Sequence, residues 1–158
     1  MAALAASSSS DTQWVLPAGP TDGITSVSFS RMVGSDTLLV SSWDGTVRGY
    51  AVKGGSLLFS HTECFPEDSD SPAAVLGAGF GADEQHLYCG GLNNTVSALH
   101  VLPTGDVAAS TLGLHEKEVK EVRWNATTGT VVSAGWDNKI RSWDPRMKSS
   151  LASTCELP

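Results

Sequence analysis

The sequence predicts an all-β protein built from four-stranded blades of a β-propeller, and three observations support this. A short phrase occurs three times in the 158 residues, at Ser41–Val47, Gly90–Val96 and Ala134–Ile140. The copies begin 49 and 44 residues apart, which is the period of a repeat that forms one blade. The centre of each copy reads Asp-Gly, Asn-Asn or Asp-Asn, which is typical of a tight turn between two antiparallel strands.

Two strands of each blade are predicted before the turn. An inner strand is indicated by apolar residues at the same offsets, and the step of three and then two residues indicates an irregularity after the first of them. These residues are Ile24, Val27 and Phe29; Val75, Ala78 and Phe80; and Val119, Val122 and Trp124. A second strand begins six residues before the Asp or Asn of each turn, at Leu38–Val40, Leu87–Cys89 and Val131–Ser133.

Two further strands follow each turn. The third strand carries a large side chain suited to packing between neighbouring blades, at Tyr50, Leu99 and Trp143. More polar runs predict outer strands that face water, at Ser56–Ser60, Asp106–Ser110 and Ser150–Thr154. The predicted blades therefore cover about residues 22–60, 73–111 and 115–155.

Three blades account for nearly all of the chain, whereas closed propellers have about four to eight. We therefore expect a partial propeller over 13–158, the first three blades of a ring of about seven. Residues 13–17 are a candidate strand for closing that ring, and the Ala/Ser-rich residues 1–12 predict a disordered tail. Residues 63–72 form an acidic loop, which we interpret as a solvated insertion, with a phosphorylation or docking segment as the alternative.

The composition predicts an intracellular protein without a cofactor or a metal site. The net charge of −7 is divided into −8 over residues 1–115 and +1 over 116–158, so no broad basic face is expected to bind nucleic acid. No run is apolar enough to span a bilayer. The three cysteines fit no metal-binding spacing and are interpreted as reduced thiols; they are Cys64, Cys89 and Cys155.

The sequence predicts no catalytic residue, and hence a protein that is not an enzyme. Residues Gly77–Ala82 fit the loose form of a dinucleotide-binding motif, but that motif lies between a strand and a helix. Here the glycines fall in a predicted inner strand and its turn. No nucleophile elbow, P-loop or zinc-protease motif occurs, and the four histidines are scattered.

Trp-Asp dipeptides, among them those at Trp43 and Trp136, mark the repeats as the WD type. WD repeats usually carry a Gly-His pair ahead of the inner strand, and His115 stands there in the third blade. We expect His115 to bond Asp137 and, together with Ser133 and Trp143, to fix the blade internally. The histidine is thus assigned a structural role.

Trp43 and Trp136 are the candidate binding residues. Each directly precedes the Asp of its turn, where WD repeats tend to have small or polar residues. These turns lie on one face of a propeller, near its central channel, so the two rings are expected to be partly exposed. Exposed tryptophan on a rigid rim is typical of a binding hot spot. The alternative is that each ring covers the edge of a neighbouring blade.

Five short phrases spread along the sequence, from Asp22–Val27 to Ser142–Arg146, together resemble the spindle-checkpoint WD-repeat proteins of the Bub (budding uninhibited by benzimidazole) family. The resemblance covers about residues 14–146, most of this chain but only the front half of such a protein. A relative, the WD-repeat messenger-RNA export factor of the nuclear pore, shares much of the pattern and is the alternative. The matching phrases are Asp22–Val27, Leu38–Asp44, Gly90–Leu92, Gly135–Asp137 and Ser142–Arg146, and the Asp-Pro-Arg at 144–146 favours the checkpoint family.

The resemblance implies a non-enzymatic scaffold that binds a short motif found in checkpoint kinases and in a nucleoporin, with Trp43 and Trp136 in contact with the motif. It also implies recruitment of the kinases to kinetochores in the nucleus, with the cytoplasm as an alternative location. Such proteins read a phosphorylated kinetochore scaffold with later blades, which this sequence does not include. Asn93 departs from the family, which often has Asp there. A ubiquitin-ligase substrate adaptor, with ligase components as partners, and a solely structural repeat fragment are alternatives from other classes.

Overall fold

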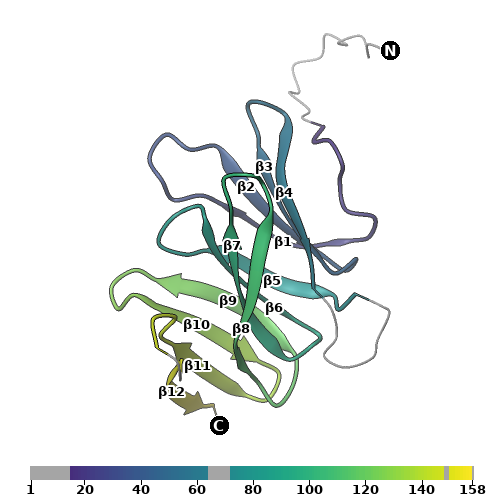
Figure 1. The fold of residues 1–158 in the computed structure, drawn as a ribbon. Helices are drawn as coiled ribbons and strands as arrows, with labels where there is room; N and C mark the ends of the chain where they lie inside the picture. Colours follow the sequence, from purple (N-terminus) through teal and green to yellow (C-terminus); the bar gives the residue numbers. More distant parts are fainter. Residues whose placement is uncertain (1–14, 64–71, 148–149, 158) are drawn as a thin grey trace.

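The computed structural model describes residues 15–63, 72–147 and 150–157, and these form three four-stranded antiparallel sheets (Figure 1). Each sheet is a meander in chain order, which confirms the predicted all-β fold of propeller blades. The predicted tail and residues 64–71 of the predicted acidic loop lie outside the described residues. Blade 1 consists of β1 (Ile24–Phe29), β2 (Thr37–Ser42), β3 (Thr46–Ala51) and β4 (Ser56–Thr62); blade 2 of β5 (Val75–Phe80), β6 (His86–Gly91), β7 (Thr95–Val101) and β8 (Val107–Leu114); blade 3 of β9 (Val119–Asn125), β10 (Thr130–Gly135), β11 (Lys139–Trp143) and β12 (Leu151–Glu156).

The inner strands β1, β5 and β9 lie beside one another, with β5 in the middle (Figure 1). Each is irregular where the spacing of apolar residues predicted it, since the pairing with the second strand shifts register one residue after the first apolar side chain. This confirms the predicted bulge. The shifts lie between Ile24 and Ser26, between Val75 and Gly77, and opposite Ala134 and Gly135.

The three turns between the second and third strands share one backbone conformation. Gly45, Asn94 and Asn138 each have a positive φ, of 79°, 60° and 60°. Glycine and asparagine are the residues that tolerate this left-handed region best, which is why the repeated phrase ends its turn on one of them. The turns therefore present their preceding residues, Trp43 and Trp136 among them, in equivalent positions.

The hydrophobic core lies between the blades. Blades 1 and 2 enclose one cluster, in which Leu39 and Phe59 meet Leu87 and Leu99. Blades 2 and 3 enclose another, built on Tyr88, Val96, Val119, Val122, Val131 and Trp143. Blade 2 is thus covered on both faces, and every residue of β5 is buried.

The large side chains of the third strands are all buried and point toward the preceding blade or the segment in its place. Leu99 lies in the first cluster and Trp143 in the second. No blade precedes that of Tyr50 among residues 15–63, 72–147 and 150–157; the Tyr50 hydroxyl donates to the carbonyl oxygen of Ala18 at 3.1 Å. A small pocket formed with Leu16 lies beside it.

Residues Val15–Pro17 form no strand here, and residues 13 and 14 lie outside the described residues. The ring-closing strand over 13–17 stays a prediction, because the described residues include no final blade for it to complete. A strand needs the free edge of another strand to satisfy its backbone groups. Here Leu16 lies beside blade 1, where it lines a pocket together with Val40 and Tyr50. Within the described stretches, no helix has the length and apolar character needed to cross a membrane.

Candidate functional site

The residue before each turn Asp or Asn is held in the same way in all three blades. Its amide donates to a carbonyl oxygen just before the inner strand, which fixes the turn to that strand. The three bonds are Trp43 to Gly23 at 2.9 Å, Leu92 to Ala74 at 3.0 Å and Trp136 to Glu118 at 2.9 Å. The two tryptophans and Leu92 therefore occupy equivalent places at one end of the blades.

Both tryptophan side chains are half exposed. Trp43 and Trp136 each leave 49% of their surface accessible, whereas Leu92 between them is more covered. The ring of Trp43 lies next to Gly23, where a Cβ atom would come within 3.4 Å of its Cδ1. Each blade on either side of blade 2 thus presents one large aromatic surface to solvent.

The turn beneath Trp43 is fixed by Asp44. The Asp44 carboxylate accepts the amides of Thr21 at 2.8 Å and Thr46 at 3.0 Å, and Arg48 Nη1 at 3.1 Å. Burial alone would raise the pKa of this carboxyl, but these hydrogen bonds outweigh it and hold the pKa well below its ordinary value. Asp44 is therefore ionised at neutral pH, and Trp43 is attached to a rigid support.

In blade 3 the structure brings together all four residues of the predicted internal network. His115 Nδ1 lies 3.0 Å from both Asp137 oxygens, and Nε2 lies 2.7 Å from Ser133 Oγ. The indole N–H of Trp143 donates to the same Oγ at 2.7 Å. One consistent arrangement has Nδ1–H donating to Asp137 and the Ser133 hydroxyl donating to Nε2.

The blade 3 network is closed to solvent and carries one ionised carboxylate. The side chains of His115 and Asp137 are almost fully buried. Burial favours the neutral acid, but hydrogen bonds from His115 and from the amides of Glu116 and Lys139 outweigh it and lower the pKa of Asp137 to about 2. The network fastens the loop before β9 to the β10–β11 turn, and so holds the strand and turn on either side of Trp136.

Blade 2 has an equivalent network of different chemistry, formed by Glu63, Cys89 and Asn93. The amide of Glu63 donates to the Gly45 carbonyl at 2.8 Å, as that of His115 does to Asn94. Its carboxylate accepts Cys89 Sγ at 3.3 Å and Asn93 Nδ2 at 3.2 Å. Glu63 therefore stands in the position of His115, a role that sequence reasoning missed when it assigned Glu63 to the acidic loop.

No metal centre accompanies these networks in residues 15–63, 72–147 and 150–157, because no group of three or more His, Cys, Asp or Glu side chains is placed to hold an ion. The cysteines within those ranges are free thiols, with Cys89 buried and Cys155 exposed. Burial raises the pKa of the Cys89 thiol well above its ordinary value, so it serves as a neutral donor.

Comparison with known families agrees with the repeat seen in the sequence and in the blades. The WD domain, G-beta repeat family matches residues 11–50 and 106–144, which together make up half of the chain. The chain belongs to the WD-repeat family. The first matched segment contains Trp43 and the second contains Trp136, so both candidate binding residues lie in recognised repeats.

Curated relatives of this WD-repeat chain are mitotic checkpoint proteins of the Bub3 type. It is 34% identical to mitotic checkpoint protein BUB3.1 of Arabidopsis thaliana over 80% of its own length and 33% of that protein. Identity is 30% to bub3 of Dictyostelium discoideum, over 87% of this chain and 38% of that protein, and 32% to bub-3 of Caenorhabditis elegans, over 83% and 36%. The chain thus spans about a third of the length of these relatives, and the resemblance to the Bub family is confirmed.

A solved structure also shares the fold. The crystal structure of the computationally designed Ika4 protein superposes with a TM-score of 0.67 over 91% of this chain and 78% of that one. Identity between the two is 22%, so this likeness shows the arrangement of the blades alone. The WD-repeat blades seen here are therefore a known way of packing four-stranded sheets.

Replacing His115 with alanine in this WD-repeat chain is expected to lower the free energy of unfolding by about 1 to 3 kcal/mol, because Asp137 and Ser133 would each lose a buried partner. Urea unfolding followed by circular dichroism measures the loss. The matched control is His86→Ala, because His86 pairs with Asp83 on the exposed surface and should change stability little. Equal effects of the two changes would contradict a structural role for His115.

Proposed function

We propose that this chain is part of a non-enzymatic scaffold of the mitotic spindle checkpoint, and that it binds a short peptide motif of a checkpoint kinase across the turns bearing Trp43 and Trp136. The observation that carries the proposal is the pair of half-exposed tryptophans at equivalent positions in blades 1 and 3. The checkpoint relatives support the process, and the short motif is the class of partner that the family resemblance implies.

The geometry suits a partner that is disordered before it binds. Such a segment loses conformational entropy on docking, so the receptor has to supply anchors that are already in place. Tryptophan provides a large apolar surface with few rotatable bonds. Here both rings stand on turns whose carboxylates, Asp44 and Asp137, are each held by several hydrogen bonds. The binding surface is therefore formed before the partner arrives.

The proposal includes the place where binding occurs. Checkpoint relatives imply that the chain acts at kinetochores or chromosomes during mitosis. The peptide site would there connect a kinase to the scaffold, and a rigid rim without catalytic groups is sufficient for that task. Recruitment of the kinase, rather than any reaction, is then the output of the protein.

Replacing Trp43 or Trp136 with alanine is expected to weaken binding of the checkpoint-kinase motif by roughly 2 kcal/mol, about 30-fold in Kd, as truncation of a hot-spot residue does. Fluorescence anisotropy of a labelled motif peptide measures the change, and circular dichroism should show the fold intact because both rings are half exposed. The control is Val33→Ala, since Val33 is fully exposed in the loop between β1 and β2, at the other end of blade 1.

Other outcomes of the same experiment assign different roles. Unfolding of the Trp43 and Trp136 variants, with binding lost only in proportion, would make the rings packing groups. Capture of a nucleoporin motif in preference to the kinase motif would favour the messenger-RNA export function. Capture of ubiquitin-ligase subunits would favour the adaptor function.

A further inference from the structure

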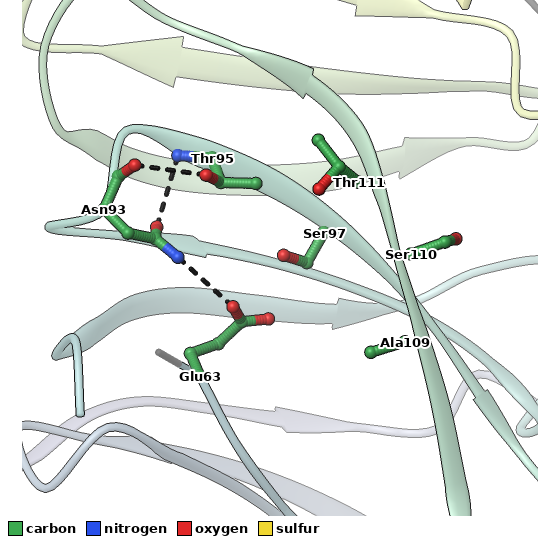
Figure 2. A pocket seen from close by; sticks show the side chains of 7 residues that line it. All are labelled: Glu63, Asn93, Thr95, Ser97, Ala109, Ser110 and Thr111. Atoms are coloured by element: carbon green, nitrogen blue, oxygen red, sulfur yellow. Dashed lines mark hydrogen bonds between the residues drawn. The ribbon is translucent and has the colours of Figure 1, made fainter. Parts of the chain in front are cut away.

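A polar cavity of about 300 Å³ lies between blades 1 and 2, beside the blade 2 network (Figure 2). Glu63, at the end of blade 1, points its carboxylate toward Asn93 on the turn of blade 2. The rest of the lining comes from β7 and β8 and is rich in hydroxyl groups: Thr95, Ser97, Ala109, Ser110 and Thr111. Ser97 and Thr111 pair across the two strands and share a face, whereas the Ser110 side chain points away from Glu63 (Figure 2).

The corresponding space in the other two blades holds an arginine of the chain itself. Arg48, Ser97 and Arg141 each stand five residues after the residue that precedes the turn Asp or Asn. Arg48 Nη1 lies 3.1 Å from the Asp44 carboxylate. Arg141 Nη2 lies 3.6 Å from the Asp137 carboxylate. Blade 2 alone of the three has serine there, and the cavity lies where the arginine side chain would extend.

Blade 2 also has an ionised carboxylate beside its turn, but a different residue supplies it. Asn93 replaces the turn Asp, and the negative charge has moved to Glu63. Burial would raise the pKa of Glu63, but hydrogen bonds from His61, Ser97 and Cys89 outweigh it and keep the pKa below its ordinary value. Cys89 and Asn93 donate to it without carrying a positive charge. Blade 2 thus keeps the acid of the turn network and lacks the arginine.

We propose that this cavity is a subsite for an arginine side chain of a bound polypeptide, whose guanidinium takes the place that Arg48 and Arg141 fill in the neighbouring blades. A guanidinium suits the site because it is planar, permanently charged and rich in donors. The Glu63 carboxylate supplies the opposite charge, and the hydroxyls of Ser97 and Thr111 supply further acceptors. The subsite is distinct from the peptide site at Trp43 and Trp136, because none of its lining residues belongs to either turn.

The test uses the whole chain labelled with ¹⁵N and two blocked tripeptides, acetyl-Gly-Arg-Gly-amide and acetyl-Gly-citrulline-Gly-amide. Citrulline has the shape of arginine without its charge. We expect the arginine peptide to shift the amide signals of Ser97 and Thr111 saturably, and the citrulline peptide to bind about tenfold more weakly or not at all. The Glu63→Gln variant should bind the arginine peptide more weakly than the parent chain by a similar factor. Asp106→Asn, which removes an exposed acid elsewhere on blade 2, should leave its affinity unchanged.

A second variant tests the site without removing the acid. Ser97→Arg should place a guanidinium in the cavity from within the chain, as Arg48 and Arg141 do, and so abolish binding of the arginine peptide while the fold is kept. The proposal is overturned if the two peptides cause the same shifts, or if the arginine peptide causes none. It is equally overturned if the arginine peptide binds the Ser97→Arg variant as well as it binds the parent chain.

Discussion

Replacing Trp143 with alanine is expected to lower the free energy of unfolding by about 3 to 5 kcal/mol, the usual cost of truncating a buried tryptophan. Trp143 is only 3% exposed and fills the space between blades 2 and 3. Its ring lies against Gly113, whose missing side chain makes room for it, so no neighbour stands ready to fill the cavity. Loss of the indole N–H also removes a hydrogen bond to Ser133.

Urea unfolding at neutral pH measures this loss, and the chain supplies its own control. Trp136 is the same residue type seven positions earlier, but it is half exposed, so Trp136→Ala should change stability by only about 0.5 kcal/mol. The two variants therefore separate a packing tryptophan from a binding tryptophan. A similar loss of stability in both would contradict the division of roles made here.

Replacing Gly91 with alanine is expected to lower the free energy of unfolding by about 3 kcal/mol, at the upper end of the usual cost of overpacking. A Cβ atom at Gly91 would overlap the carbonyl oxygen and carbon of Ala74. That carbonyl cannot simply move, because it accepts the amide of Leu92 at 3.0 Å and adjoins the bulge that begins at Val75. The bond to Leu92 is the one that holds the blade 2 turn to its inner strand.

Thermal unfolding followed by circular dichroism checks this second expectation. The control is Gly19→Ala, where the added Cβ meets nothing within 4 Å. The midpoint of unfolding should fall clearly for Gly91→Ala and stay near that of the parent chain for Gly19→Ala. An unchanged midpoint for Gly91→Ala would mean that the strands around Ala74 can separate freely, in conflict with the tight register of β5 and β6.

Much of the fold could be predicted because each blade repeats the same local physics. The turns had to contain residues that accept a positive φ, and Gly45, Asn94 and Asn138 do. The offset of apolar residues in the inner strands revealed a bulge before any pairing was known, because a shift of one residue moves side chains to the other face. Tyr50, Leu99 and Trp143 were identified as packing residues for the same reason, since they recur at one register position.

The parts that could not be predicted depend on contacts between distant segments. Glu63 lies 30 residues before Asn93, whereas His115 lies 22 before Asp137, and the eight extra residues hide the equivalence of Glu63 and His115. The different residue types, glutamate in blade 2 and histidine in blade 3, also make the two positions hard to recognise as equivalent. The segment around Leu16 has the apolar pattern of a strand. Its position beside Tyr50 could not be predicted, because it depends on which other segments of the folded chain lie next to it. The sequence does show that Trp43 and Trp136 stand on exposed turns, while their role in binding a peptide stays a prediction.

Each of the three blades fixes the turn between its second and third strands with a different set of polar groups. This difference affects how the chain folds. Neighbouring repeats of similar shape are prone to exchange strands while they are being made. The β6–β7 hairpin, placed in blade 3, would set Asn93 and Cys89 against His115 in place of Asp137 and Ser133, and Leu99 would offer no N–H where Trp143 has its indole. We therefore expect the differences between the polar networks to favour pairing of each hairpin with the inner strand of its own blade.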